Sequence, residues 1–302
     1  MISKYPEFTE VDLSVQKEIE AELSKYDSYS DFNFVSLFCW NADNSSAVSR
    51  LGDGLVIRLS DYLGNGQNYS YISNSKDSRK YIDIILTTVK KLKFVPEHTV
   101  KLISDMTGLN IKEDLDNFDY IYSVSKLSTL EGGKLKKKRN KVNNFEKEMD
   151  EQTLIKHLDK ITKQHKSEIE ILFKKWCNEN KKSFDSQKDE YAAVHRAIEN
   201  LDQLGLIFTE LRHNGELMGF SINQVLQDGS AVCHFEKTLN AHKNISPYLV
   251  REVAIMLNKK GCKYVNWEQD LGLEGLKQAK SSYKQEYFLK KYTISKSRNI
   301  SN

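Results

Sequence analysis

The sequence is poor in the features that mark several protein classes. Its 302 residues include only 3 prolines and 14 glycines, which argues against a disordered low-complexity chain. The 4 cysteines are far apart and show no CxxC spacing, so we expect buried free thiols in a reducing compartment. No run approaches the roughly 18 apolar residues of a membrane-spanning helix, and the first residues lack the apolar core of a signal peptide. We therefore expect a cytoplasmic protein without an integral membrane segment.

An excess of one charge is also missing. The 45 basic and 42 acidic residues give a net charge of +3, which is too small to indicate nucleic-acid binding by itself. No Walker loop, GxSxG elbow or GxGxxG motif occurs, and no Cys or His doublet has the spacing of metal ligands, so no metal site is expected. What is present is ample apolar content, 39%, which suffices for one large domain or two ordinary ones.

The first half of the chain reads as helices and antiparallel strands. Apolar residues at four-residue spacing predict a helix over 14–24, and a β-prone aromatic run predicts a strand over 32–40. The step Asp53-Gly54 between two apolar runs predicts a hairpin, because glycine readily takes the positive φ that the turn requires. Further expected elements are a strand at 69–73, a helix at 78–92 and a strand at 100–104.

The second half follows the same order. Two helices are expected, one carrying the apolar positions of 154–176 and one over 191–201, followed by a three-strand meander over 206–237 with turns at Asn214-Gly215 and Asp228-Gly229. Ser246 and Pro247 predict the N-cap and first turn of another helix, and a strand begins at Lys263. The last strand–helix–strand crossover makes its two strands parallel.

This order is that of an acyl-CoA N-acyltransferase (GNAT) unit. Its double appearance predicts an α+β fold of two tandem GNAT-like domains, residues 1–125 and 126–302, each a mixed, mostly antiparallel sheet flanked by helices. A basic helix over about 134–149 introduces the second domain. It carries six basic residues between Lys134 and Lys141.

The apolar side of this basic helix carries an arginine. Arg139 falls between Leu135 and Val142 on the apolar stripe, whereas a neighbouring track that includes Lys138 can face water. An arginine in that position usually reaches a carboxylate or an anion, and Glu236, Glu268 and Asp270 are the alternative partners. The functional hypothesis is a site for the phosphates of a donor, either coenzyme A or the acceptor end of a charged tRNA. For the outer lysines, the alternative is a solvated charged face.

Polar residues gather at two strand ends. His234 and Glu236 share one face of their strand, and Asn266 and Glu268 share one face of the next. Acyl transfer to an amine requires a base and a donor to the developing oxyanion. His234 or Glu236 could act as the base, and Tyr283 or a backbone N–H as the donor. The alternative is a purely structural histidine–glutamate pair.

The segment 239–246 lies where an acetyltransferase carries its glycine-rich pyrophosphate loop, yet it contains no glycine. This argues against ordinary acetyl-CoA binding there. The helix N-terminus at Ser246 still offers free N–H groups and the positive end of a helix dipole to an anion.

Several motifs resemble one protein family. They are Asp119-Tyr-Ile-Tyr, Leu127-Ser, the basic run from Gly133 to Phe145, His234-Phe-Glu-Lys, and the segment from Asn266 to Tyr283. Together they resemble the DUF2156 family, which is related to the C-terminal catalytic domain of phosphatidylglycerol lysyltransferases. The resemblance covers essentially the whole chain. It implies a tandem GNAT-like fold similar to the FemX-type aminoacyltransferases, which use aminoacyl-tRNA.

The leading hypothesis is a transferase that moves an acyl or aminoacyl group from a thioester or aminoacyl-tRNA to an amine or hydroxyl. The acceptor would be a small molecule or a lipid headgroup. The proposed catalytic residues are Glu236, His234, Glu268 and Tyr283; the donor- or anion-binding residues are Lys137, Arg139, Asn140, Lys277 and Lys280; and Asn266 and Asp270 complete the pocket. The alternatives are a non-catalytic binding protein that holds an anionic ligand in its cleft, and a polar cluster that is only structural.

Overall fold

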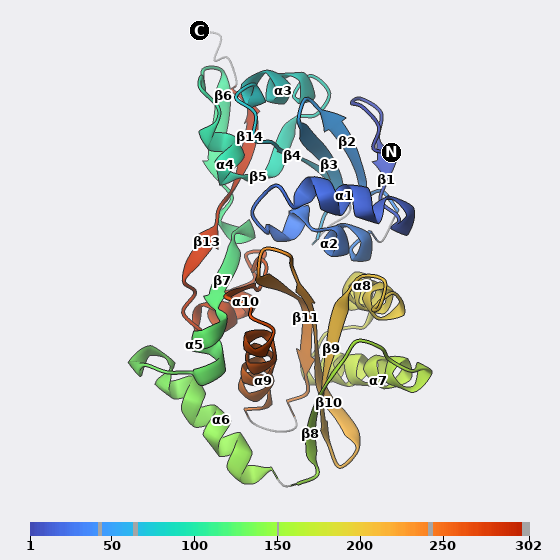
Figure 1. The fold of residues 1–302 in the computed structure, drawn as a ribbon, viewed down its shortest axis with the longest axis vertical. Coiled ribbons are helices and arrows are strands. Elements are labelled where there is room, and N and C mark those ends of the chain that lie inside the picture. The colour runs from blue at the N-terminus through green and yellow to red at the C-terminus, as the bar shows by residue number, and fades with distance from the viewer. Residues whose placement is uncertain (42–43, 63–65, 150, 241–243, 298–302) are drawn as a thin grey trace. The chain divides into compact units, whose positions relative to one another are not determined.

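A computed structural model of the chain describes residues 1–41, 44–62, 66–149, 151–240 and 244–297. The chain forms two compact units (Figure 1). The first comprises Met1–Asp119, Gln269–Lys277 and the residues from Phe288 on, and the second comprises Tyr120–Glu268 and Gln278–Tyr287. The predicted α+β class, with mostly antiparallel sheets flanked by helices, is confirmed.

The first unit is built on two antiparallel sheets. One has the strand order β1-β2-β3-β4, and the other has the order β5-β14-β6, so the late strand β14 lies between two early strands. Its elements are β1 (Thr9–Glu10), α1 (Gln16–Leu23), α2 (Phe34–Cys39), β2 (Ala47–Leu51), β3 (Gly54–Ser60), β4 (Gln67–Ile72), α3 (Ser78–Ile85), β5 (Lys91–Pro96), α4 (Glu97–Lys101), β6 (Leu109–Glu113) and β14 (Lys291–Lys296).

The core of the first unit joins both sheets to α3. Ile82 and Ile85 of α3 pack with Val56 of β3, Leu92 of β5 and Ile294 of β14, and all five side chains are fully buried. Burying an aliphatic side chain of this size contributes about 1.5–3 kcal/mol. The final strand is therefore part of the main core of this unit.

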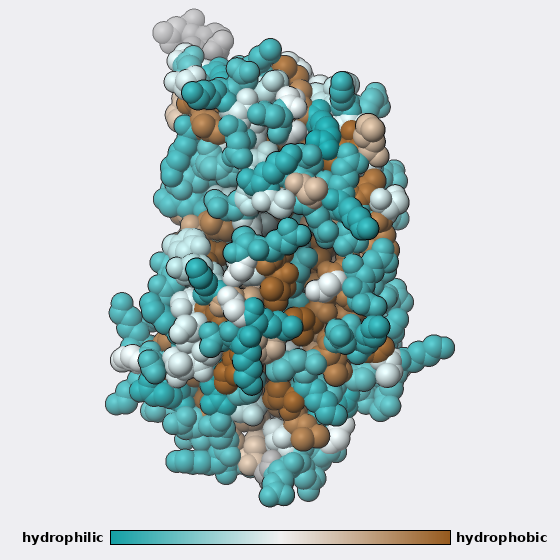
Figure 2. Space-filling view, viewed as in Figure 1, coloured by the Kyte–Doolittle hydropathy of each residue, from teal (hydrophilic) through white to brown (hydrophobic). Residues whose placement is uncertain are grey.

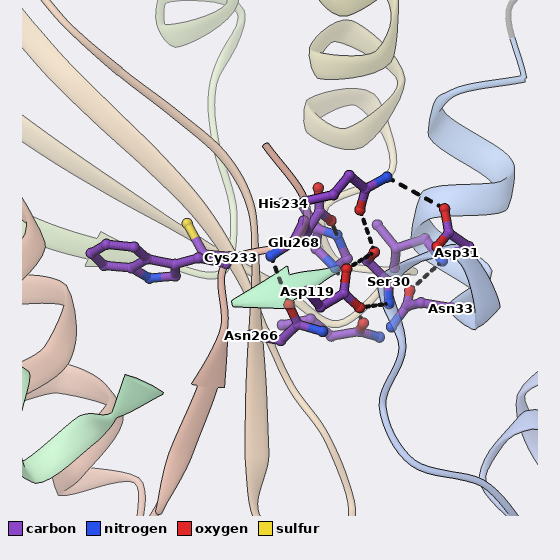
Figure 3. A network of polar contacts seen from close by, with 12 residues as sticks. Ser30, Asp31, Asn33, Asp119, Cys233, His234, Asn266 and Glu268 are labelled. Carbon is purple, nitrogen blue, oxygen red and sulfur yellow. Dashed lines mark hydrogen bonds and ion pairs between the residues drawn. The ribbon is translucent and has the colours of Figure 1, made fainter. Parts of the chain in front are cut away.

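The first unit also contains a buried ionic cluster, of which Figure 3 labels Ser30, Asp31 and Asp119. The ammonium of Lys291 is fully buried and contacts Asp31 and Asp119, the latter with Nζ 2.6 Å from Oδ1. Ser30 donates to Asp119 from both its backbone N–H and its hydroxyl, each at 2.7 Å, and Tyr62 donates to Asp31 at 2.8 Å. Two carboxylates thus share one ammonium out of contact with water.

The second unit holds most of a seven-stranded sheet in the order β13-β7-β12-β11-β10-β9-β8. Its elements are α5 (Val124–Thr129), α6 (Lys136–Glu148), β8 (Thr153–Leu158), α7 (Lys163–Glu179), α8 (Lys188–Glu199), β9 (Leu206–His213), β10 (Glu216–Val225), β11 (Ser230–Thr238), α9 (Ile245–Lys259) and β12 (Tyr264–Asn266). Three further elements have residues in both units: β7 (Asp119–Ser123), α10 (Glu274–Ser281) and β13 (Tyr287–Leu289).

Strand pairing in this sheet follows the sequence prediction. β9, β10 and β11 form the antiparallel meander, and β12 pairs parallel to β11 with Val232 opposite Asn266. In Figure 1, α9 covers one face of these strands, and α7 and α8 lie on the other. The basic helix is also confirmed, as α6. Its Phe145 packs against Tyr248 of α9, with ring centroids 4.7 Å apart.

Three expected elements of the chain are wrong. The run 32–40 forms a 3-10 turn and helix α2, for which the Asn33 side chain accepts from the N–H of Val35. Because both sides of this run are buried, its periodicity could not separate a strand from a helix. The region 100–104 contains the end of α4 and no strand. The strand of this part of the chain is β5, which ends at Pro96, before α4 begins. The long helix expected from residue 154 is instead β8 followed by α7, which begins after a capping box at Thr162.

On the face shown in Figure 2, hydrophilic residues predominate, with groups of hydrophobic residues between them. No helix among the described residues is long and apolar enough to cross a membrane. All four cysteines are free thiols; Cys39, Cys177 and Cys262 are buried, and Cys233 is partly exposed.

Candidate functional site

Strand β11 carries two ionisable residues of the candidate site, His234 and Glu236. The register of β11 against β10 shifts between Ile222 and Asn223 and skips His234, so strict alternation does not hold there. Glu236 lies opposite Ser221, whose Oγ is 3.6 Å from Sγ of Cys233.

Lys237, the next residue, points to the other face from Glu236 and pairs with Glu190 of α8 at 2.7 Å. Ser246 of α9 donates its hydroxyl to Oε1 of Glu236 at 3.5 Å. The Glu236 side of β11 therefore faces the start of α9.

His234 is held at both ring nitrogens. Nδ1 lies 3.1 Å from Oε1 of Glu268, and Nε2 lies 3.3 Å from Oε1 of Gln224 (Figure 3). The imidazole is almost completely buried. An imidazole held at both ring nitrogens is well suited to orienting Glu268.

The backbone after β12 takes an unusual conformation that its neighbours support. Glu268 has φ of 56°, in the left-handed region, where a non-glycine residue is strained. The side-chain oxygen of Asn266 accepts from the N–H of Glu268 at 2.6 Å. Lys280 of α10 donates to the carbonyls of Trp267 and Glu268. Strain of this kind, when neighbouring groups hold it in place, is common at functional sites.

Glu236 has the strongly perturbed carboxyl group of this site. Burial raises its pKa to about 7, although the hydroxyl of Ser246 and the ammonium groups of Lys280, Lys138 and Lys237 lower it. A carboxyl group with a pKa close to neutrality is suited to general base catalysis, because it is both available as a base and able to hold a proton.

Tyr283 contributes a buried hydroxyl to the same region. Its ring packs edge-on against Trp267 with centroids 5.0 Å apart, and burial raises its pKa. The hydroxyl lies near the Ser246 hydroxyl and the Glu236 carboxyl group, yet it makes no hydrogen bond of normal geometry to any described residue. Leaving a buried hydroxyl without a hydrogen-bond partner costs about 1–3 kcal/mol of stability. This hydroxyl is therefore available to donate to an acceptor oxygen of a ligand.

The basic helix contributes a different residue from the one expected. Arg139 reaches no carboxylate among the described residues; its Nη1 donates to the carbonyl of Leu130, at the end of α5, at 2.7 Å. Lys138, which the sequence placed on the water-facing track, lies instead with Nζ 3.7 Å from the centroid of the Tyr283 ring. Burial lowers the pKa of Lys138 to about 8, with a further decrease from Lys141 and an opposing effect from Glu236.

The helix itself explains why Lys138 lies on this side. At about 100° per residue, Lys138 falls only about 25° from the centre of the apolar stripe, and Arg139 about 75° from it. The buried Leu135 and Val142 of that stripe lie one turn to either side of Lys138. Angular position along the stripe could have identified Lys138 from the sequence.

Four further predicted residues lie on α6 or in the first unit. Lys137 and Asn140 are exposed on α6. Lys277 and Asp270 belong to the first unit, where the side chain of Asp270 accepts from the N–H of Gly272 at 2.8 Å. The structure thus brings together Glu236, Tyr283 and Lys280, and it joins His234 to Glu268 and Glu268 to Asn266.

The start of α9 also differs from the prediction. The helix begins at Ile245 with Asn244 as N-cap, so Ser246 lies inside the first turn and its hydroxyl is free to bond to Glu236. Within the glycine-free segment 239–246, residues 241–243 lie outside the described residues.

A cavity of about 440 Å³ adjoins this site within the second unit. It lies between α5, the turn before α6 and the segment that follows α10. Tyr122 and Tyr283 line it together with Lys126, Lys134 and Lys284. Glu131 and Glu286 also line it, and Glu286 pairs with Lys126 at 2.6 Å, so the walls carry charges of both signs around the two tyrosine rings.

Comparison with known sequences found a family model and a related protein that match this chain. The sequence model of the family described as phosphatidylglycerol lysyltransferase, C-terminal, matches residues 24–295. An uncharacterised protein of Mycoplasmoides gallisepticum is 24% identical over 205 residues, and this match spans 64% of the chain and 64% of that relative.

Solved structures share the fold over almost the entire chain. A conserved protein of unknown function from Bacteroides thetaiotaomicron is 26% identical with a TM-score of 0.81, covering 98% of this chain and 100% of that one. The structure of L-PGS from Bacillus licheniformis is 14% identical with a TM-score of 0.65, covering 98% and 94%. FemX is 9% identical with a TM-score of 0.56, covering 95% and 96%, which confirms the expected likeness to the FemX fold.

Proposed function

The chain belongs to the phosphatidylglycerol lysyltransferase C-terminal family, and on this premise we propose that its second unit transfers an aminoacyl group from an aminoacyl-tRNA ester to an acceptor hydroxyl. The acceptor class that we propose is the hydroxyl-bearing headgroup of an anionic lipid. The name of the family supports both assignments, since it pairs a lysyl donor with phosphatidylglycerol.

One observation carries the proposal. A half-buried carboxyl group, Glu236, has a pKa raised to about 7 and lies near the buried, unpartnered hydroxyl of Tyr283. Acyl transfer requires these two functions, a base for the acceptor and a donor for the oxyanion.

The roles follow from the chemistry of each group. Glu236 accepts the proton of the acceptor hydroxyl as that oxygen attacks the ester carbonyl. The Tyr283 hydroxyl donates to the carbonyl oxygen as negative charge develops on it. Lys280, fixed on two backbone carbonyls, supplies positive charge beside Glu236 and stabilises its anionic form.

His234 and Glu268 have a supporting role in this scheme. Their contact fixes the strained backbone at Glu268, whose carbonyl accepts from Lys280. Lys137, Arg139 and Asn140 of α6 are proposed as the side chains that approach donor phosphates. Arg139 also holds the end of α5.

Product formation tests the proposal directly. Purified protein is incubated with radiolabelled lysyl-tRNA, alanyl-tRNA or an acyl-CoA, and with vesicles of phosphatidylglycerol or phosphatidylcholine. We expect labelled lipid from an aminoacyl-tRNA and phosphatidylglycerol only. Glu236→Gln should lower kcat by about 10²–10⁴-fold, whereas Glu148→Gln, an exposed position at the end of α6, should leave it unchanged.

Two results would reject the proposal. One is the absence of transfer from every donor to every acceptor. The other is a Glu236→Gln variant as active as the wild type. A binding protein without catalysis would behave differently: a ligand present at 100 times its dissociation constant would stabilise the fold by about 2.7 kcal/mol and yield no product.

A further inference from the structure

Lys138 occupies a fixed, inward position on α6. Buried Leu135 and Val142 precede and follow it by one turn, and both pack in a small core with Leu130 and Tyr248. Arg139, the next residue, ties the helix to the carbonyl of Leu130. These contacts fix the first turns of α6 and leave the Lys138 side chain directed at Tyr283.

The ammonium of Lys138 is not neutralised by contact. It rests on the face of the Tyr283 ring, 3.7 Å from the centroid, an arrangement in which the ring quadrupole attracts the cation. Among the described residues, no carboxylate forms an ion pair with it, and Glu236 acts on it at longer range. Lys141 of the same helix is the other charged group that acts on it.

The other cations near Glu236 are already committed. The ammonium of Lys280 donates to the carbonyls of Trp267 and Glu268. Lys237 lies on the opposite face of β11, bound to Glu190. Of these three lysines, Lys138 alone keeps its protons available to a ligand.

Transfer from an ester requires an acid as well as a base. The leaving oxygen of a ribose ester is a poor leaving group unless it receives a proton as the carbon–oxygen bond breaks. We propose that Lys138 is the general acid that protonates this leaving oxygen. The inference rests on the proposed function and adds to it a catalytic residue and a donor class, an oxyester.

The protons and bonds of the step balance. The acceptor oxygen forms a bond to the carbonyl carbon and its proton goes to Glu236. The bond from that carbon to the ribose oxygen breaks, and the oxygen takes a proton from Lys138. Transfer of one proton from Glu236 back to Lys138 restores both groups for the next cycle.

The two pKa values agree with these roles. The pKa of Glu236 is raised to about 7 and that of Lys138 is lowered to about 8, so the two values bound a narrow range of pH. Between them the carboxyl group is largely ionised and the ammonium group is largely protonated, which are the forms that a base and an acid require. The groups that act on Glu236 are Ser246, Lys280, Lys138 and Lys237.

Substitutions at this position separate acid catalysis from simple charge. Lys138→Arg keeps the positive charge but holds its proton too tightly to release it. We expect kcat with an aminoacyl-tRNA to fall about 10²-fold with KM within about twofold, and the alkaline limb of the pH profile to disappear. Lys136→Met, which removes an exposed charge two residues away, should change neither. Full activity in Lys138→Arg would overturn the inference.

A second donor sharpens this comparison. A thiolate leaves without prior protonation far more readily than an alkoxide, because its pKa is near 8.5. With an aminoacyl thioester in place of the tRNA ester, we therefore expect the loss in Lys138→Arg to shrink to a few-fold. An equal loss with both donors would assign Lys138 to charge stabilisation instead.

A direct titration keeps the inference testable apart from activity. Lysines are reductively methylated with ¹³C and followed by NMR, and the Lys138 signal is assigned from its absence in Lys138→Arg. It should titrate near pH 8 and shift to lower pH in Glu236→Gln, because that change removes a nearby negative charge. A Lys138 that titrates at the ordinary lysine pKa overturns the inference even if no donor is found. Absence of transfer in a protein whose Lys138 titrates near 8 would reject only the proposed function.

Discussion

Replacing Lys291 by methionine should strongly destabilise the first unit. The Lys291 ammonium is fully buried between the carboxylates of Asp31 and Asp119. Methionine fits the same volume but leaves two buried carboxylates without a cation. Removing one partner of a buried ion pair costs about 3–5 kcal/mol, because an uncompensated charge stays out of water.

The matched control is the next lysine along the chain. Lys290 is 41% exposed at its side chain and pairs with Glu113 at 2.9 Å. Exposed pairs contribute about 0–1 kcal/mol, so Lys290→Met should have little effect. The same substitution at adjacent positions thus isolates burial as the variable.

Asp31→Asn should behave in the opposite way to Lys291→Met. Burial raises the pKa of Asp31, as does Asp119, while Lys291 lowers it. The folded protein therefore binds a proton at Asp31 more tightly than the unfolded chain does. This contribution to stability is present at low pH and is lost as pH rises from the unfolded pKa through the raised folded pKa. Asparagine resembles the protonated form, so the variant should lose this pH dependence and keep most of its stability near neutral pH.

Calorimetry of the four proteins between pH 4 and 8 provides the measurement. For a unit of this size, 1 kcal/mol shifts Tm by about 2–4 °C, so Lys291→Met should lower Tm by about 6–20 °C. A shift below 2 °C, or an Asp31→Asn variant as unstable as Lys291→Met, would refute the reasoning from burial and charge.

Further predictions concern the site and its flanks. In the wild type, kcat/KM should fall below about pH 7, where Glu236 with its raised pKa becomes protonated; a pH–rate profile without that limb would exclude it as the base. Lys280→Met should lower kcat by about 10-fold through release of the two backbone carbonyls, measured by single-turnover transfer. Gly272→Ala should destabilise by about 1–3 kcal/mol, because Gly272 has φ of 70° and a Cβ would lie 2.9 Å from Asp116. Gly275→Ala, in helix α10 with open space around it, should stabilise by about 0.5–1 kcal/mol, and chemical denaturation compares the two.

Local signals in the sequence were sufficient where the structure depends on turns and strand connections. Asn214 and Gly215 both have positive φ, of 52° and 80°, as the Asn-Gly hairpin signal requires. The parallel pairing of β12 with β11 brought Glu268 to His234, whereas alternation along β11 fails at His234, where the register with β10 shifts. The correct predictions depended only on residues that are adjacent in the sequence and on the strand–helix–strand connection from β11 to β12.

Long-range charge pairing could not be predicted in this way. Asp119 lies 172 residues before Lys291, and nothing local marks Lys291 as buried among other lysines near the end of the sequence. Lys138 is different, because its angle on α6 was available in advance. There a charged side chain was assumed to face water, whereas a long lysine stem can pack on an aromatic ring and still carry a charged end.

The position of β14 has a consequence for how the protein is made. This strand completes a sheet by entering between β5 and β6, and it brings the ammonium that Asp31 and Asp119 require. A ribosome that has synthesised everything up to residue 290 has therefore produced all the other strands of the first unit and none of their final partner. Until Lys291 and the rest of β14 have been synthesised, the earlier strands have a gap in their sheet and Asp31 and Asp119 lack their cation, so the first unit cannot close.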